Sequence, residues 1–169
     1  MPLLTYSQQQ AIKPISANLQ NRYSQIEKEV EDMYLDKLLG VSFAQDVQSN
    51  PLNYVDLLDG STFTLNGETI KHKGIRYCLA YYLYAEYVGQ SDVNDTYTGL
   101  RTQSREEAQP LQKGRIEIIR NQYLNLANDA FELIKSYLDV NQSIYPLYST
   151  GKTKSVSNFS IQGIRKTVK

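Results

Sequence analysis

His72 and Cys78 are the side chains best suited to catalysis or metal binding, and the chain contains one residue of each type. A Ser-His-Asp or Cys-His unit would have to use His72, and a Cys/His zinc site would lack ligands. Two lysines flank His72 in a polar stretch, which indicates a solvated loop or strand histidine. A single cysteine cannot form a disulfide within the chain. We therefore expect no catalytic residue, no metal site and no cofactor.

Nucleotide-binding motifs do not occur either, since the sequence has no Gly-x-x-x-x-Gly-Lys-Ser/Thr and no Gly-x-Gly-x-x-Gly. Residues 150–153, Thr-Gly-Lys-Thr, match only the end of the first motif and do not open a periodic helix. The acidic clusters at 29–32 and 106–107 have polar surroundings, which are typical of surface charges rather than acid–base pairs. The sequence predicts that the protein is not an enzyme.

Charge is distributed unevenly along the chain, although the net charge is zero. Residues 1–140 contain 13 basic and 18 acidic side chains, whereas residues 141–169 contain five basic side chains and no acidic one. Such a basic segment can pair with the acidic body of a neighbouring subunit. It can also contact phosphates, so a small helical nucleic-acid-binding or regulatory protein is the alternative function, although a pI near 6.6 is unlike that of a basic domain.

Three long helices are predicted to form the core, at about 15–39, 74–88 and 111–140. Apolar residues recur at spacings of three and four in the first and third segments. The second segment is apolar nearly all round, which is typical of a central, buried helix. In the third segment, the predicted core face consists of Ile116, Ile119, Tyr123, Leu126, Ala130, Ile134 and Tyr137.

Shorter elements are predicted between these helices. Ser42 and Gln45 have the spacing of a capping box, and Asn50-Pro51 favours a second helix start. Asn66-Gly67 lies between two β-prone runs and predicts a hairpin over 62–71. Residues 90–109 form a long polar loop with a turn near Gly99. No apolar run is long enough to span a membrane, and the first ten residues lack the pattern of a secretory signal.

The predicted fold class is mainly α: a bundle of three long helices with short helices and a small hairpin. We divide the chain into a helical domain, 1–144, and an extended basic tail, 145–169. Phe159 and Ile161 alternate with polar neighbours as in a half-buried strand, so we expect a partner to receive the tail, partly by strand addition. The predicted interface residues are Tyr148, Lys152, Lys154, Val156, Phe159, Ile161, Ile164, Arg165 and Lys166.

The order of these elements resembles that of another protein family. The resemblance rests on four stretches of sequence: Tyr-Leu-Asp-Lys-Leu-Leu-Gly at 34–40, Tyr-Val-Asp-Leu-Leu at 54–58, the tyrosine-rich helix at 74–87 and Thr-Gly-Leu at 98–100. Over roughly residues 15–145 the chain resembles head–tail connector (adaptor) proteins of tailed bacteriophages, especially those of Bacteroidota phages, including the crAss-like phages. The longer basic tail departs from the pattern of that family.

The resemblance implies a structural virion subunit without catalytic residues. Members of this family form a ring, commonly twelvefold, that docks under the portal protein and adjoins further neck or tail proteins. Genomic DNA contacts the ring only as it passes through the channel, and no membrane is involved. The expected location is therefore the virion neck, with host cytoplasm as the site of assembly.

Overall fold

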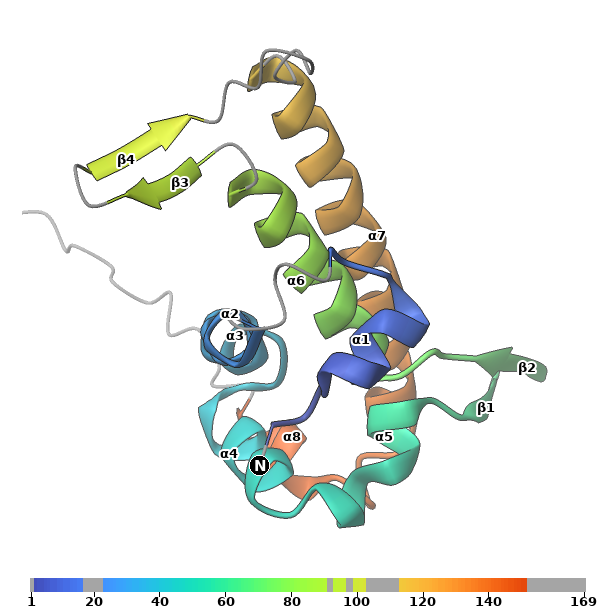
Figure 1. Cartoon of the computed structure of the whole chain (residues 1–169). Helices are drawn as coiled ribbons and strands as arrows, with labels where there is room; N and C mark the ends of the chain where they lie inside the picture. Colours follow the sequence, from blue (N-terminus) through green and yellow to red (C-terminus); the bar gives the residue numbers. More distant parts are fainter. Residues whose placement is uncertain (1, 17–22, 91–92, 97–98, 103–112, 152–169) are drawn as a thin grey trace, which may run out of the picture.

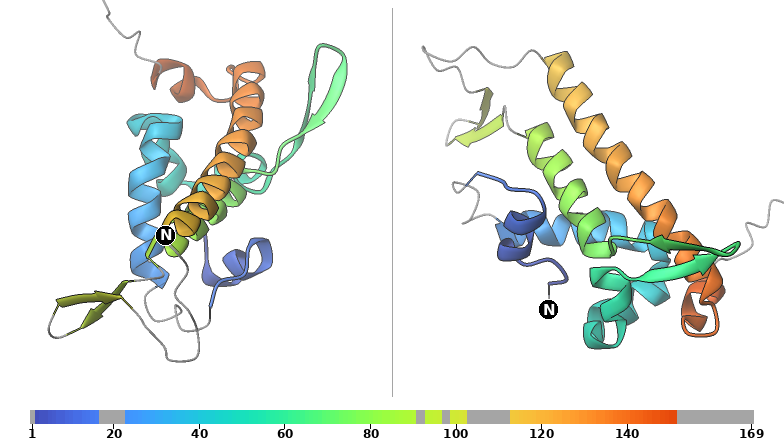
Figure 2. Two further views of the ribbon diagram at one scale, coloured as in Figure 1. Left: turned by 90° about the horizontal axis from the view of Figure 1, so that it is seen from above. Right: turned by 90° about the vertical axis from the view of Figure 1, so that its right-hand side faces the viewer.

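The computed structural model describes residues 2–16, 23–90, 93–96, 99–102 and 113–151 (Figure 1). The fold is mainly helical with a small antiparallel hairpin, which confirms the predicted fold class. Helix α6 (Ile75–Gln90) lies in the middle. The long helix α7 (Lys113–Val140) packs along one side of α6, and a helix made of α2, η2 and α3 packs on the other (Figures 1 and 2).

Helix α6 carries the centre of the core because its apolar side chains point in almost every direction. Leu79, Tyr82 and Leu83 are almost completely buried. The Tyr82 ring stacks on the Tyr34 ring with centroids 4.1 Å apart, and the Tyr82 hydroxyl donates to Asn128 Oδ1 on α7 at 2.6 Å. The tyrosine hydroxyl thus finds the partner that a buried polar group requires.

The first predicted long helix exists from residue 23 onward. Helix α2 (Tyr23–Val30) continues without a break through a π-helical turn, η2 (Glu31–Leu35), into α3 (Asp36–Leu39). Gly40 ends it with a φ of 82°, as the sequence predicted. The predicted start at Ile15 is wrong: Ile15 and Ser16 are not helical, and Ile15 is buried as part of a connecting segment.

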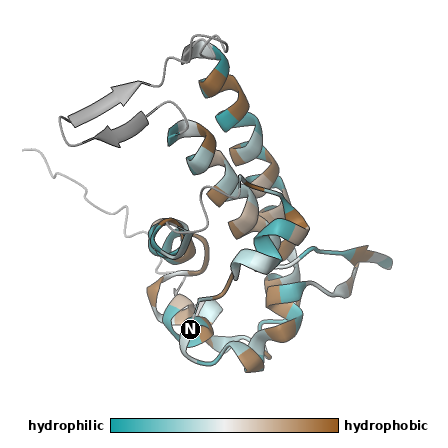
Figure 3. Cartoon of the chain, in the orientation of Figure 1, coloured by the Kyte–Doolittle hydropathy of each residue, from teal (hydrophilic) through white to brown (hydrophobic). Residues whose placement is uncertain are grey.

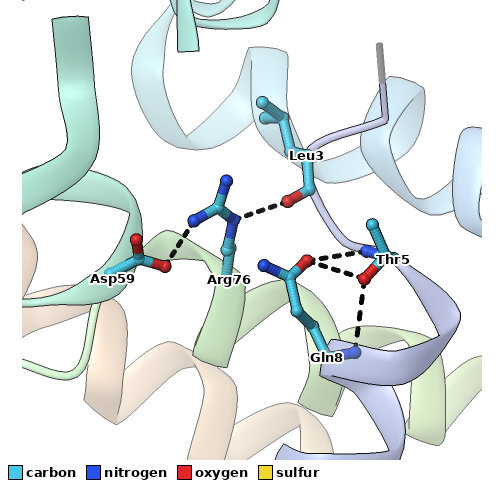
Figure 4. A network of polar contacts seen from close by, with 5 residues as sticks. All are labelled: Leu3, Thr5, Gln8, Asp59 and Arg76. Atoms are coloured by element: carbon cyan, nitrogen blue, oxygen red, sulfur yellow. Dashed lines mark hydrogen bonds and ion pairs between the residues drawn. The ribbon is translucent and has the colours of Figure 1, made fainter. Parts of the chain in front are cut away.

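A helix that the sequence analysis missed, α1 (Tyr6–Ile12), precedes this segment. Thr5 and Gln8 form a reciprocal capping box at its start, in which Gln8 N donates to Thr5 Oγ1 at 3.3 Å and Thr5 N donates to Gln8 Oε1 at 2.9 Å (Figure 4). The Thr-x-x-Gln spacing was the available signal. Gln9 fastens α1 to α6, because its Nε2 donates to the Ala80 carbonyl at 3.3 Å.

The short helices after Gly40 are α4 (Val41–Ser49), η3 (Pro51–Tyr54) and α5 (Val55–Asp59). The predicted cap at Ser42 is wrong, because Gly40 occupies the N-cap position and Ser42 lies inside α4. Pro51 is the first residue of η3, as predicted.

Two hairpins complete the described elements. Strands β1 (Thr62–Leu65) and β2 (Glu68–Lys71) pair antiparallel. Asn66 and Gly67 both have positive φ, so the predicted hairpin is confirmed. The segment predicted as a polar loop contains a second pair, β3 (Val93–Thr96) and β4 (Gly99–Thr102). Residues 97–98 of the predicted turn lie outside the described residues.

The helical body continues past residue 144. Helix α8 (Pro146–Gly151) packs against α4, and the Tyr148 ring lies 5.9 Å from the Phe43 ring, centroid to centroid. The Tyr145 and Tyr137 hydroxyls are hydrogen-bonded at 2.9 Å. The start of the segment predicted as an extended tail is thus helical and belongs to the core.

Candidate assembly surfaces

The outer face of α7 presents a stripe of large apolar side chains. Leu126, Leu133 and Val140 are exposed and follow one another at intervals of seven residues, and Ile118 precedes them with 61% of its surface exposed. A seven-residue spacing keeps side chains on nearly the same helix face. Ala127 and Ile134, which α7 buries, directly follow Leu126 and Leu133 in the sequence, so they lie about 100° around the helix from the stripe. We call this surface the α7 stripe; Figure 3 shows apolar residues recurring along the whole of α7.

A second group of exposed apolar residues lies on η2, α4, η3 and α5. Met33 lies on η2 and Val41 begins α4, whereas Leu52 and Val55 lie on η3 and α5. Leu52 is the extreme case, with 87% of its surface exposed. Large apolar side chains that gather on an exposed surface are typical of contacts with other chains.

Polar contacts link η2, on one side of α6, to α7 on the other side. Glu86 on α6 accepts from the Tyr34 hydroxyl at 2.6 Å and from Arg120 Nη2 on α7 at 2.7 Å. Burial and the neighbouring Glu86 carboxylate raise the pKa of the Tyr34 hydroxyl well above its usual range. Tyr34 therefore stays protonated and remains a donor, so η2, α6 and α7 share one hydrogen-bonded link.

The structure does not bring the predicted interface residues together on a surface. Tyr148 is buried in the core of its own chain against Phe43, which corrects its assignment to an interface. The other predicted residues lie outside the described part of the chain: Lys152, Lys154, Val156, Phe159, Ile161, Ile164, Arg165 and Lys166.

His72 is not the solvated residue that its polar neighbours predicted. The side chain is completely buried, its Nε2 is hydrogen-bonded to Ser61 Oγ at 3.0 Å, and its ring lies 4.4 Å from the Tyr137 ring. Burial lowers the pKa of His72, and the charge of Asp56 opposes this only in part. Lys71, the last residue of β2, and Lys73 are exposed on either side of His72.

Cys78 is also buried, on the inner side of α6, and burial raises the pKa of its thiol to about 12. Since the thiolate is the reactive form, Cys78 is a packing residue. The described part of the chain contains no group of three or more His, Cys, Asp or Glu side chains placed to hold a metal ion. None of the helices in the described ranges is long and apolar enough to cross a membrane.

Glu27 and Glu31 form a buried carboxyl pair one helical turn apart, which corrects the expectation that the acids near Glu31 are solvated. Only 5% of the Glu27 surface is exposed, and Glu31 Oε1 accepts from Leu3 N at 2.6 Å. Desolvation first, and then the hydrogen bond and charge of Glu31, raise the pKa of Glu27 to about 9, although the Leu4 backbone N–H opposes this. Glu27 is therefore protonated at neutral pH.

The raised pKa of Glu27 predicts that the free energy of unfolding falls as pH rises from 6.5 to 8. Unfolded Glu27 is ionised throughout this range while folded Glu27 keeps its proton, so the folded state binds more protons and loses up to about 1.4 kcal/mol of unfolding free energy per pH unit. Buried His72 has the opposite effect, but its contribution is lost only as pH falls through about 6.5. Urea denaturation at several pH values measures the slope.

The matched variants are Glu27→Gln and Glu29→Gln, since Glu29 is exposed on the same helix. Glu27→Gln should flatten the slope, because no carboxyl remains to carry the proton, whereas Glu29→Gln should keep it. Equal slopes in the wild type and in both variants would contradict the assignment.

Comparison with known proteins yields a match to a family model. The model of DUF6712, a family of unknown function, matches residues 35–158. This range runs from the end of η2 to beyond α8 and includes α6 and the whole of α7 with its stripe. No curated protein and no solved structure matches the chain.

Proposed function

The chain belongs to the DUF6712 family, and because the function of that family is unknown, we propose one from the surfaces of the chain: it is a structural subunit that assembles into a head–tail connector ring in the neck of a tailed-phage virion. The ring contains copies of this chain, commonly twelve in the connectors that it resembles. It docks on the portal protein and on further neck or tail proteins, and DNA passes through it.

The α7 stripe is the observation that carries this proposal. Four large apolar side chains over the outer face of one 28-residue helix are unfavourable in water, and each contributes about 1.5–3 kcal/mol when fully buried. The helix itself needs no further partner for folding, since its inner residues Phe131, Ile134 and Leu138 already pack in the core. The stripe is therefore available for contact with another chain.

The position of the second apolar group favours a ring rather than a symmetric dimer. The stripe lies on α7, whereas Met33 and Val41 lie on η2 and α4. The helix that contains η2 packs on the other side of α6 from α7 (Figure 2). A contact between two different surfaces of identical subunits is heterologous, and it closes into a ring when the rotation between subunits allows. The resemblance to connector proteins supports the same arrangement, and the Glu86 link keeps the two surfaces in register.

We expect Leu133→Asp to abolish incorporation into particles without unfolding the chain. Leu133 is exposed on α7, so an aspartate there leaves the core intact but places a charge in the proposed contact. Negative-stain micrographs and immunoblots of purified particles measure incorporation, and circular dichroism checks the fold. Asn121→Asp is the control, because Asn121 is exposed on α7 but points to another face of the helix, five residues before Leu126.

Two results would contradict the proposal: incorporation of Leu133→Asp at the wild-type level, or particles that lack this protein. The nucleic-acid-binding alternative predicts a different outcome. In that case the purified protein should bind DNA with an affinity that falls steeply as salt increases, and Leu133→Asp should leave this binding unchanged.

A further inference from the structure

An open groove of about 1300 Å³ lies between two helical walls near the N-terminal segment. One wall is the α2–η2 helix, which contributes Glu27, Glu31 and Asp32. The other wall runs from the end of α4 through η3 into α5 and contributes Leu52 and Val55. Small-molecule sites usually occupy about 300–1000 Å³ and enclose the ligand, so the size and openness of this groove favour an elongated chain.

The helical wall of the groove has an unused hydrogen-bond acceptor. Glu27 Oε1 is buried and has no hydrogen-bond partner among the described residues, although the side chain lines the groove. A buried polar atom without a partner is costly and calls for a donor. Asp32 is exposed at the rim. This wall is therefore suited to a cationic side chain, with one acceptor at depth and a carboxylate at the edge.

The basic groups that line the groove do not cancel this preference. Arg76 Nε donates to the Leu3 carbonyl at 2.7 Å and the guanidinium pairs with Asp59, so its charge is already balanced (Figure 4). Lys28 is exposed on the same wall as Asp32. With Glu27 protonated, the charged acids of the lining are Glu31, Asp32 and Asp59, and they still outnumber the bases Lys28 and Arg76.

The opposite wall offers apolar contact. Leu52 is 87% exposed and Val55 is 49% exposed, and both line the groove. A chain that places a cation on the helical wall would lay its apolar side chains on these two residues. The groove thus selects a basic segment that also carries large apolar residues.

We propose that this groove binds residues 152–169 of a neighbouring copy of the chain. The segment contains Lys152, Lys154, Arg165, Lys166 and Lys169 without any acidic residue, and Phe159, Ile161 and Ile164 supply the apolar anchors. Its charge and apolar content are the complement of the two walls. The inference rests on the proposed ring, because only assembly brings a second copy to the groove.

Photo-cross-linking in the full-length chain tests this assignment. Val55 is replaced by benzoylphenylalanine, the protein is irradiated in its assembled state, and the cross-linked peptides are identified by mass spectrometry. We expect cross-links to peptides from 152–169, in a band of two chains. A second protein with the cross-linker at Ile118 reports contacts between copies through the α7 stripe, independently of the groove.

Asp32→Lys in the Val55 cross-linking protein should lower the yield about tenfold, since it places like charges against the basic segment. Asp36→Lys is the matched control, because Asp36 is also exposed, on the next turn, but does not line the groove. Cross-links that lie within one chain, or that do not reach 152–169, would overturn the inference. If Ile118 still cross-links neighbouring copies in that case, the ring stands and only the groove assignment fails. Cross-links from Val55 to residues 152–169 of another copy, in assemblies that form no closed ring, would instead support the groove assignment and overturn the proposed function.

Discussion

Replacing Leu79 by alanine should lower the free energy of unfolding by about 2–5 kcal/mol, the usual loss when a buried leucine is truncated. Leu79 is 1% exposed in the middle of α6. Because α7 and α2 pack on α6 from two sides, the surroundings of Leu79 cannot easily collapse into the space that is left. Urea or thermal denaturation followed by circular dichroism measures the difference.

The same substitution at Leu126 is the matched control. Leu126 belongs to the face of α7 that the sequence predicted as core, but its side chain is 48% exposed. Since it buries much less surface, Leu126→Ala should cost less than about 1 kcal/mol in the isolated chain. Equal losses for the two variants would mean that the α7 stripe is buried in the folded chain, and the proposed assembly surface would then be wrong.

Hydrophobic periodicity predicted the existence of the long helices and most of the buried face of α7. Ile116, Ile134 and Tyr137 are buried as predicted, whereas Leu126 is exposed. Apolar residues of this helix fall on two faces, since Leu126 and Leu133 alternate with Ala127 and Ile134. A period of 3.6 fits either face, and only the packing of α6 decides which one is buried. For the same reason, the exposed stripe could not be separated from the core by sequence alone. Ile119, predicted as core, is half-buried at the boundary of the two faces.

Predictions from short sequence motifs were correct where one residue type dominates the local backbone conformation. Asn66-Gly67 fixed the first hairpin, because both positions need positive φ. The prediction failed where two residues could begin the helix. Ser42 is a residue type that often caps helices, but Gly40 both ends α3 and occupies the N-cap position of α4. A helix-breaking glycine at the junction leaves Ser42 inside the next helix.

Buried polar residues were the least predictable part of the molecule. Glu27 and His72 both have charged neighbours in the sequence, and both are buried through contacts with distant segments. Glu31, the partner of Glu27, hydrogen-bonds to Leu3, 28 residues away, and the ring of His72 packs on Tyr137 of α7. Such partners follow from tertiary structure. Consequently, the groove acceptor at Glu27 could not be predicted from its sequence neighbours.

Gly74→Ala should be among the most destabilising single substitutions in the chain. Gly74 has a φ of +84°, and a Cβ atom there would lie 2.3 Å from the Leu58 carbonyl oxygen and 2.5 Å from Gly60 N. These contacts are with backbone, so no side-chain rotation relieves them. The left-handed conformation costs about 1–2 kcal/mol for a residue with a Cβ, and overpacking adds about 1–3 kcal/mol. Chemical denaturation should therefore show a loss of about 2–5 kcal/mol.

Gly67→Ala separates the two contributions. Gly67 has nearly the same φ, +85°, but nothing lies within 4 Å of the position that its Cβ would take. The free energy of unfolding of this variant should therefore fall only by the cost of the left-handed conformation, about 1–2 kcal/mol. The difference between the two variants measures how closely Gly60 and Gly74 bring the end of α5 to the start of α6. That approach positions Asp59 beside Arg76, on one side of the groove. If Gly74→Ala lowered the free energy of unfolding no more than Gly67→Ala, the close contact between the end of α5 and the start of α6 would be disproved. The rigid placement of the α5 wall of the groove would be disproved with it.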